Sequence, residues 1–69
     1  KELLNIYPNP SSQIITLNIP NSTNYQIIDI SGKTIVNASY NGNVNISDFS
    51  NALYFIKVDG FAIQKLVKK

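Results

Sequence analysis

The chain has 69 residues, including six lysines but no arginine, histidine or cysteine, and its net charge at pH 7 is +2. Without histidine and cysteine it lacks the usual general base, the commonest metal ligand and any thiol nucleophile, and scattered lysines do not form the basic stripe of a nucleic-acid-binding protein. We therefore expect a single domain over residues 1–69, with a core over 3–69, that is not an enzyme, takes no cofactor or metal and binds no nucleic acid.

Seven short strands separated by turn signals account for most of the sequence. Isoleucine, valine, tyrosine, phenylalanine and threonine dominate the apolar runs, whereas asparagine, a poor helix former, occurs ten times. The pattern predicts strands at residues 3–7, 13–19, 25–30, 33–38, 44–47, 53–58 and 61–67. No apolar run approaches the roughly 18 residues of a membrane helix, so we expect no membrane insertion.

The first turn, between the first two predicted strands, contains two prolines in the segment IYPNPSS. Each proline holds the residue before it in extended backbone, so the pair fixes the direction of the chain at this corner. Asn9 and Ser11 can accept hydrogen bonds from nearby turn amides. Local geometry is enough to explain the corner without a ligand.

Three further turns end in glycine, at residues 31–32, 41–42 and 59–60. Two-residue connections of this kind predict tight hairpins and hence antiparallel pairing. We expect a positive φ at Gly32, which such turns demand. The predicted fold class is all-β: a small immunoglobulin-like antiparallel β-sandwich of about seven strands.

Few side chains stand out as candidates for chemistry. Asp29, beside the turn at 31–32, is expected to stabilise that turn, because one carboxylate does not make a calcium site. Tyr54 and Phe55 point to opposite faces of their strand, so one of them is expected in the core. Lys68 and Lys69 lie where strand ends fray and where surface charges contribute little to stability.

Three segments, taken in order, resemble the C-terminal sorting domain of the type IX secretion system. They are YPNPSSQIITLNI, YQIIDISGKTI and ISDFSNALYFIKV, and a lysine-rich end follows the last. Mapped onto this sequence, the family motifs fall on Tyr7, Pro8, Asn9 and Pro10, on Asp29, Gly32 and Lys33, on Phe49, Leu53 and Tyr54, and on Lys65, Lys68 and Lys69. The chain departs from the family at Ala52, where the family usually has glycine.

The resemblance implies a transport signal rather than a catalyst. The chain would be cut from a longer secreted precursor of a Bacteroidota-type bacterium, in which an N-terminal cargo domain precedes it; the first residue is not methionine and no signal peptide is present. The type IX translocon of the outer membrane would recognise the folded domain, and a surface protease would remove it. The cargo would pass through the periplasm and the outer membrane and end secreted or at the cell surface.

The family also places the signal at the extreme C-terminus. We therefore expect the tail lysines, of which Lys65 is the most interior in the sequence, to matter more for export than for stability.

Two other functions stay open at this point. A carbohydrate-binding or adhesion module would need exposed aromatic side chains in a row, for which the candidates are Tyr25, Tyr40, Tyr54 and Phe61. A structural spacer would stand among similar modules. The sequence upstream of the domain would distinguish these readings from a sorting signal.

Overall fold

The computed structural model describes residues 3–9 and 13–69, and its regular structure in those ranges is entirely β. The strands are β1 (Ile6–Tyr7), β2 (Ile14–Leu17), β3 (Asn24–Asp29), β4 (Thr34–Ser39), β5 (Val44–Asn45), β6 (Ala52–Val58) and β7 (Gln64–Lys68). In these ranges no helix is long and apolar enough to cross a membrane. The all-β prediction with seven strands is confirmed.

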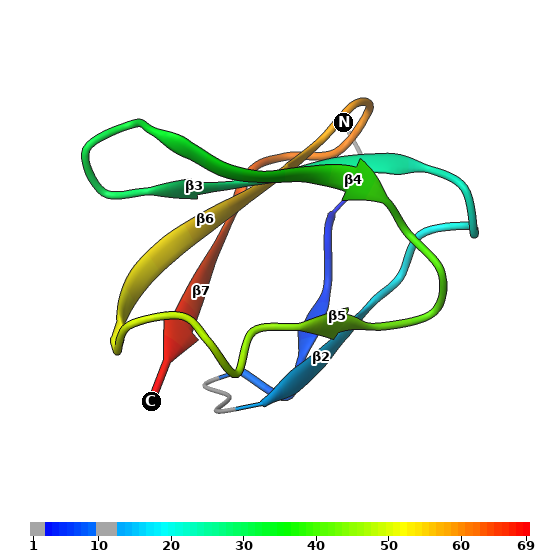
Figure 1. Cartoon of the computed structure of the whole chain (residues 1–69). Coiled ribbons are helices and arrows are strands. Elements are labelled where there is room, and N and C mark those ends of the chain that lie inside the picture. The colour runs from blue at the N-terminus through cyan, green and yellow to red at the C-terminus, as the bar shows by residue number, and fades with distance from the viewer. Residues whose placement is uncertain (1–2, 10–12) are drawn as a thin grey trace.

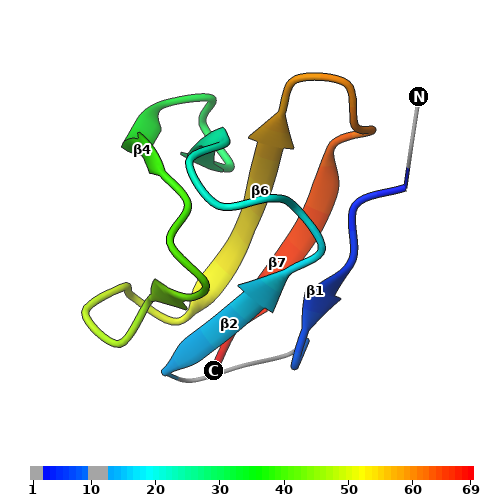
Figure 2. The same ribbon diagram turned by 90° about the vertical axis from the view of Figure 1, so that its right-hand side faces the viewer.

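The strands form two antiparallel sheets that face each other (Figure 1). The smaller sheet has the order β1-β2-β5, and the larger has the order β4-β3-β6-β7. A view from the side shows β1 and β2 of the smaller sheet in front of β6 and β7 of the larger one (Figure 2). The predicted sandwich is therefore confirmed, with the chain crossing between the sheets after β2, β4 and β5.

Along each strand, every second side chain points inward, and these side chains fill the space between the sheets. In β6, Tyr54, Ile56 and Val58 are buried, while the alternate residues Leu53 and Phe55 keep part of their surface in solvent. The fully buried side chains come from both sheets and from the segments beside them: Leu4, Ile15, Ile27, Ile46, Ile56 and Leu66. Each such side chain contributes roughly 1.5–3 kcal/mol by leaving water, which is the main stabilising term for a domain without disulfides.

Tyr40 connects the two sheets where the chain leaves β4. Its backbone N–H donates to the carbonyl oxygen of Thr23 at 2.8 Å, and its buried hydroxyl accepts from the N–H of Leu17, in β2, at 3.0 Å. Its ring also packs edge-on against Tyr25, with 6.3 Å between the ring centres. The predicted hairpin at residues 41–42 is wrong, because β5 pairs with β2 instead of β4. Gly42 takes a φ of 107°, but its turn serves a crossing between sheets.

The turn after β3 is a hairpin, with a loop of three residues rather than the predicted two. The N–H of Gly32 donates to the Asp29 carbonyl at 3.0 Å, and the N–H of Asp29 donates to the Lys33 carbonyl at 2.9 Å. This is a tight turn followed by a bulge residue in left-handed backbone. The positive φ predicted for Gly32 is confirmed at 91°.

The first and last strands differ in extent from the prediction. β1 begins at Ile6, because the backbone before it bonds a side chain instead of a neighbouring strand. After β6, the N–H of Phe61 closes a turn on the Val58 carbonyl at 3.1 Å, and the β6–β7 ladder begins at Gln64, opposite Ile56. Residues 61–63 have the apolar composition of a strand, but only Phe61 makes an isolated bridge and the stretch is not part of β7.

Replacing Gly32 isolates the cost of its backbone conformation, because a Cβ there would meet no atom within 4 Å. We expect Gly32→Ala to lower the free energy of unfolding by about 1–3 kcal/mol through backbone strain. Gly32→Asn should cost less, since asparagine tolerates left-handed backbone. Urea unfolding of the three proteins measures this, and equal stability of the alanine variant and the wild type would contradict it.

Candidate functional site

The side-chain amide of Asn9 binds the free edge of the C-terminal strand. Its Nδ2 donates to the carbonyl oxygen of Lys65 at 2.9 Å, and its Oδ1 accepts from the N–H of Val67 at 3.1 Å. A side-chain amide carries the same donor and acceptor as a peptide group. Asn9 therefore takes the place of a neighbouring strand beside β7, an edge strand that among the described residues pairs otherwise with β6 alone. The sequence predicted bonds to nearby turn amides, and the structure directs this amide to β7 instead.

Asn18 does the same for the N-terminal segment. Its Oδ1 accepts from the N–H of Asn5 at 2.7 Å, and its Nδ2 donates to the carbonyl oxygen of Leu3 at 3.1 Å. Both ends of the described chain are thus held by an asparagine amide that spans residues i and i+2 of an extended segment. The sequence offered no signal for either pairing beyond the abundance of asparagine.

The rest of the proline corner lies at the surface. Tyr7 pairs with Thr16 at the end of β1 and its side chain is 51% exposed. Pro8 is exposed and follows a cis peptide bond. Pro10, the remaining residue of this motif, lies outside the described residues. The chain thus leaves the smaller sheet after Tyr7, and Asn9 lies beside β7 of the larger sheet.

One carboxylate oxygen organises the β3–β4 hairpin. Oδ1 of Asp29 accepts from the hydroxyl of Ser31 at 2.6 Å, from the N–H of Ser31 at 2.9 Å and from the N–H of Lys33 at 3.0 Å. The Ser31 hydroxyl first, and then the Lys33 N–H, hold the pKa of Asp29 below its usual range. Asp29 stabilises a turn, as predicted. The described residues contain no cluster of three acidic or other potential metal ligands.

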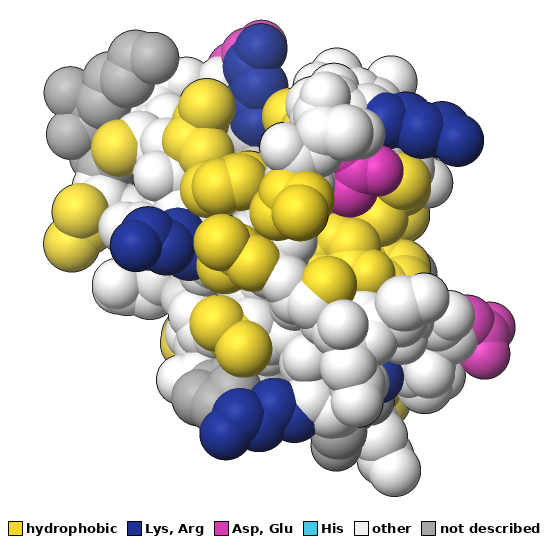
Figure 3. Space-filling model, turned by 90° about the vertical axis from the view of Figure 1, so that its left-hand side faces the viewer, with side chains coloured by type: hydrophobic (Ala, Val, Ile, Leu, Met, Phe, Trp, Pro, Cys, Tyr) yellow, Lys and Arg dark blue, Asp and Glu magenta, His cyan; other side chains and the backbone are white. Residues whose placement is uncertain are grey.

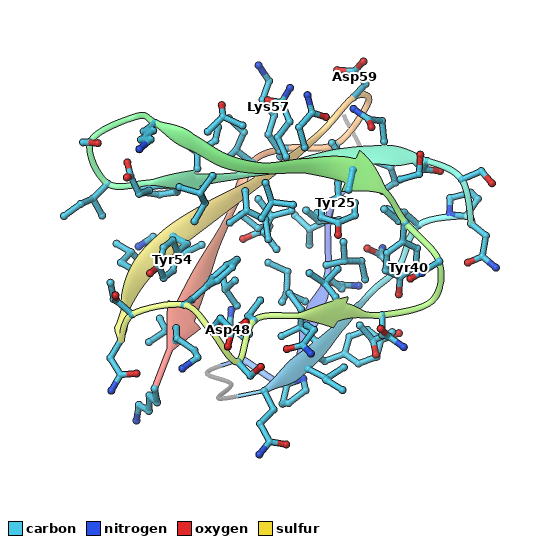
Figure 4. The ribbon with its side chains drawn as sticks, in the orientation of Figure 1. Tyr25, Tyr40, Asp48, Tyr54, Lys57 and Asp59 are labelled. Carbon is cyan, nitrogen blue, oxygen red and sulfur yellow. The ribbon has the colours of Figure 1, made fainter. Side chains whose placement is uncertain are left out.

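Tyr54 points into the core beside the end of β7. Its ring lies between the two sheets in Figure 4, and it is 5% exposed. Its hydroxyl donates to the carbonyl oxygen of Ser50 at 2.7 Å, and its ring centre is 5.1 Å from that of Phe49. Tyr54 is opposite Asp29 on β3 and Leu66 on β7. This tyrosine therefore anchors the loop before β6 and offers no surface for a ligand.

The three tail lysines occupy different environments. Lys65 and Lys69 are exposed, but Lys68 is 7% exposed and its ammonium group lies 3.4 Å from Oδ1 of Asn51. The expectation that Lys68 is a solvated strand end is wrong: Lys65 is the most interior of the three in the sequence, but Lys68 is the one that is buried. The reason is the alternation of β7, which turns Leu66 and Lys68 inward and Lys65 outward.

Three of the four aromatic candidates for a carbohydrate platform are core residues. Tyr25, Tyr40 and Tyr54 are each at most 7% exposed and lie between the sheets in Figure 4. Phe61 is partly buried against the core. These four residues do not form the exposed aromatic row that a carbohydrate-binding module needs.

The structure brings the motif segments together in the larger sheet and at its edge. Asn9 contacts β7, Asp29 is paired with Tyr54, and Lys68 is paired with Ala52 two positions before Tyr54. Gly32 and Lys33 complete the Asp29 turn. Segments that are up to 58 residues apart in sequence are thus neighbours in space.

Comparison with known proteins gives one match. A family model described as a secretion system C-terminal sorting domain matches residues 5–69 of the chain. Neither the curated proteins nor the solved structures contain a match.

The burial of Lys68 separates it from the other tail lysines in stability. We expect Lys68→Ala to lower the free energy of unfolding by about 1–2 kcal/mol, because the buried stem and the bond to Asn51 are lost. Lys65→Ala and Lys69→Ala should stay within about 0.5 kcal/mol of the wild type. Urea unfolding of the three single variants tests this, and equal effects at all three positions would contradict it.

The lowered pKa of Asp29 makes the hairpin sensitive to acid. Its ionised form stabilises the folded state above the unfolded pKa of about 3.9, and this contribution is lost as the pH falls through the lower pKa of the folded protein. Asp29→Asn removes this dependence while keeping an acceptor oxygen, as Asn45 does for Ser47 at 2.9 and 2.6 Å. Between pH 7 and pH 2.5, the wild type should lose more stability in urea unfolding than the variant; equal losses would contradict this.

Proposed function

This chain belongs to the secretion system C-terminal sorting domain family, and from that membership we propose that the type IX machinery reads it as a folded unit whose first and last motifs are joined by Asn9. The domain is a C-terminal sorting signal of type IX secretion. Such a signal implies a cargo region on its N-terminal side and delivery through the outer membrane to the cell surface or the extracellular space.

The specific partners belong to the proposal. The outer-membrane translocon binds the folded domain, and a surface protease then separates it from the cargo. The domain acts by binding and catalyses nothing, a role that suits a sequence without histidine, cysteine and arginine. Residues of the motifs serve this role in two ways: some build the fold and others remain on its surface.

The contact between Asn9 and β7 is the observation that supports recognition of the folded form. The corner and the tail are separated by most of the chain and become neighbours only after the sandwich has assembled. A machinery that reads both must therefore bind the folded domain, whereas a linear tail would be sufficient for a receptor that reads the last residues alone. Lys65 and Lys69, which are exposed beside this contact and at the chain end, are the tail lysines available to a receptor.

A reporter fused to the N-terminal side of residues 1–69 tests this function directly. In a bacterium with a type IX system the reporter should reach the cell surface or the medium, and in the same strain without the translocon it should stay in the periplasm. Equal delivery in both strains would contradict the sorting role.

Asn9→Ala separates folded recognition from tail recognition. Loss of two hydrogen bonds should lower the free energy of unfolding by about 1–2 kcal/mol, release the edge of β7 and reduce export of the reporter. Asn18→Ala is the matched control, because it removes the same pair of bonds from the other end of the chain. The measurements are urea unfolding and the exported fraction of the reporter. Full export of a destabilised Asn9→Ala protein would show that the machinery reads the tail without the corner.

A further inference from the structure

The outer face of the larger sheet, turned away from the core, carries apolar side chains at one end. Register places Ile28 of β3 opposite Phe55 of β6, and Leu53 of β6 opposite Val67 of β7. These four residues form what we call the outer patch. Val67 is 36% exposed and the other three are partly exposed. Figure 3 shows hydrophobic side chains gathered in the middle of one side of the molecule, with both lysine and acidic side chains around them.

The other end of the same face is polar. Asn24, Gln26, Lys57 and Asp59 line a hollow of about 100 Å³ there. Lys57 and Asp59 point away from the core in Figure 4. The outer face is therefore divided into an apolar half and a hydrophilic half, and the division does not follow from the core, which lies on the opposite side of the sheet.

Positive charge accompanies the outer patch. Lys65 is directly opposite Phe55 on β7, and Lys57 lies two positions along β6 from Phe55. The outward positions of β3, β6 and β7, all within the described residues, carry no aspartate or glutamate. Asp59 neighbours Lys57 at the polar hollow, which leaves Lys65 as the lysine within the apolar half.

We propose that the outer patch, together with Lys65, is the surface through which this sorting domain docks on a protein of the type IX machinery that presents apolar side chains beside aspartate or glutamate. This inference rests on the proposed function and adds to it the face used and the chemistry of the partner. Apolar contacts flanked by a complementary charge are the usual composition of a protein interface, in which the charge sets orientation.

Charge and shape favour this partner over two others. A second copy of the chain would offer Lys65 no complementary charge from the outward positions of its β3, β6 and β7, which carry no aspartate or glutamate. A lipid surface needs apolar groups that reach roughly 5–10 Å past the headgroups. Ile28, Leu53 and Phe55 are only partly exposed, so they suit contact with another protein better than insertion into lipid.

Photo-crosslinking during export tests the proposal. A photoreactive phenylalanine derivative is placed at Val67 in the reporter fusion, and the matched control carries it at Ser39, which is exposed at the far end of β4. Light should join position 67, but not position 39, to a component of the machinery, and mass spectrometry should place the link in a peptide with apolar and acidic residues. Links to lipid alone, to a second copy of the chain, or equally from both positions would overturn the proposal.

Variants of the patch give a second, independent readout. Leu53→Thr with Val67→Thr keeps strand-forming residues but removes apolar surface, and Lys65→Glu reverses the charge. For these variants the photoreactive residue is placed at position 28. Each variant should lower both the crosslinked yield and the exported fraction about fivefold or more, which is the size expected for interface anchors. Urea unfolding verifies that the variants stay folded, and Lys65→Arg, which keeps the charge, should retain export.

The outcomes distinguish the proposal from the function on which it rests. If the wild-type fusion is not exported by the type IX strain, the sorting function itself fails. If the wild type is exported and the folded patch variants are exported equally well, the function stands and the outer patch is not the docking surface. Restored export of Lys65→Glu by an acid-to-lysine change in the crosslinked peptide would identify the facing residue.

Discussion

One amide, the side chain of Asn9, closes the edge of the C-terminal strand and joins the first motif of the chain to the last. A chain of this length buries only about 60% of the surface that it exposes when unfolded, and this one has neither a disulfide nor a histidine–cysteine metal site to add stability. An edge strand leaves a row of backbone groups without partners. Asn9 satisfies two of them from a corner that the first strand delivers, so it fastens the end of the chain to its beginning without an eighth strand.

In this small sandwich, asparagine and aspartate side chains repeatedly make hydrogen bonds to backbone groups that a neighbouring strand would otherwise make. Asn18 bridges Leu3 and Asn5 as Asn9 bridges Lys65 and Val67. Single oxygens of Asp29 and Asn45 each gather the N–H and the hydroxyl of a serine two residues later. Such groups give backbone N–H and C=O groups a partner at places where a short strand ends or no strand lies alongside.

The sequence predicted local structure well and long-range pairing poorly, for a physical reason. The alternation of apolar and polar side chains predicted seven strands, and the tight turn predicted a positive φ at Gly32. Both features are determined by residues that are close together in the sequence. The partner of Asn9 and the burial of Lys68 depend on which strand lies beside β7, a fact of assembly. The asparagine–glycine pair at 41–42 predicted a hairpin from local sequence alone. In the structure the chain crosses to the other sheet there: the Tyr40 hydroxyl bonds β2, and β5 pairs with β2.

In the docking that we propose, one face of β7 contributes to stability and the opposite face to recognition. Leu66 and Lys68 point inward and hold the strand on the sandwich, whereas Lys65 and Val67 point outward beside Phe55 and Leu53. Deleting the last two residues would remove one inward and one outward position together, so a loss of export after truncation would not by itself separate unfolding from lost recognition. Changes restricted to one face of the strand do separate them, because a β-strand assigns consecutive side chains to opposite sides.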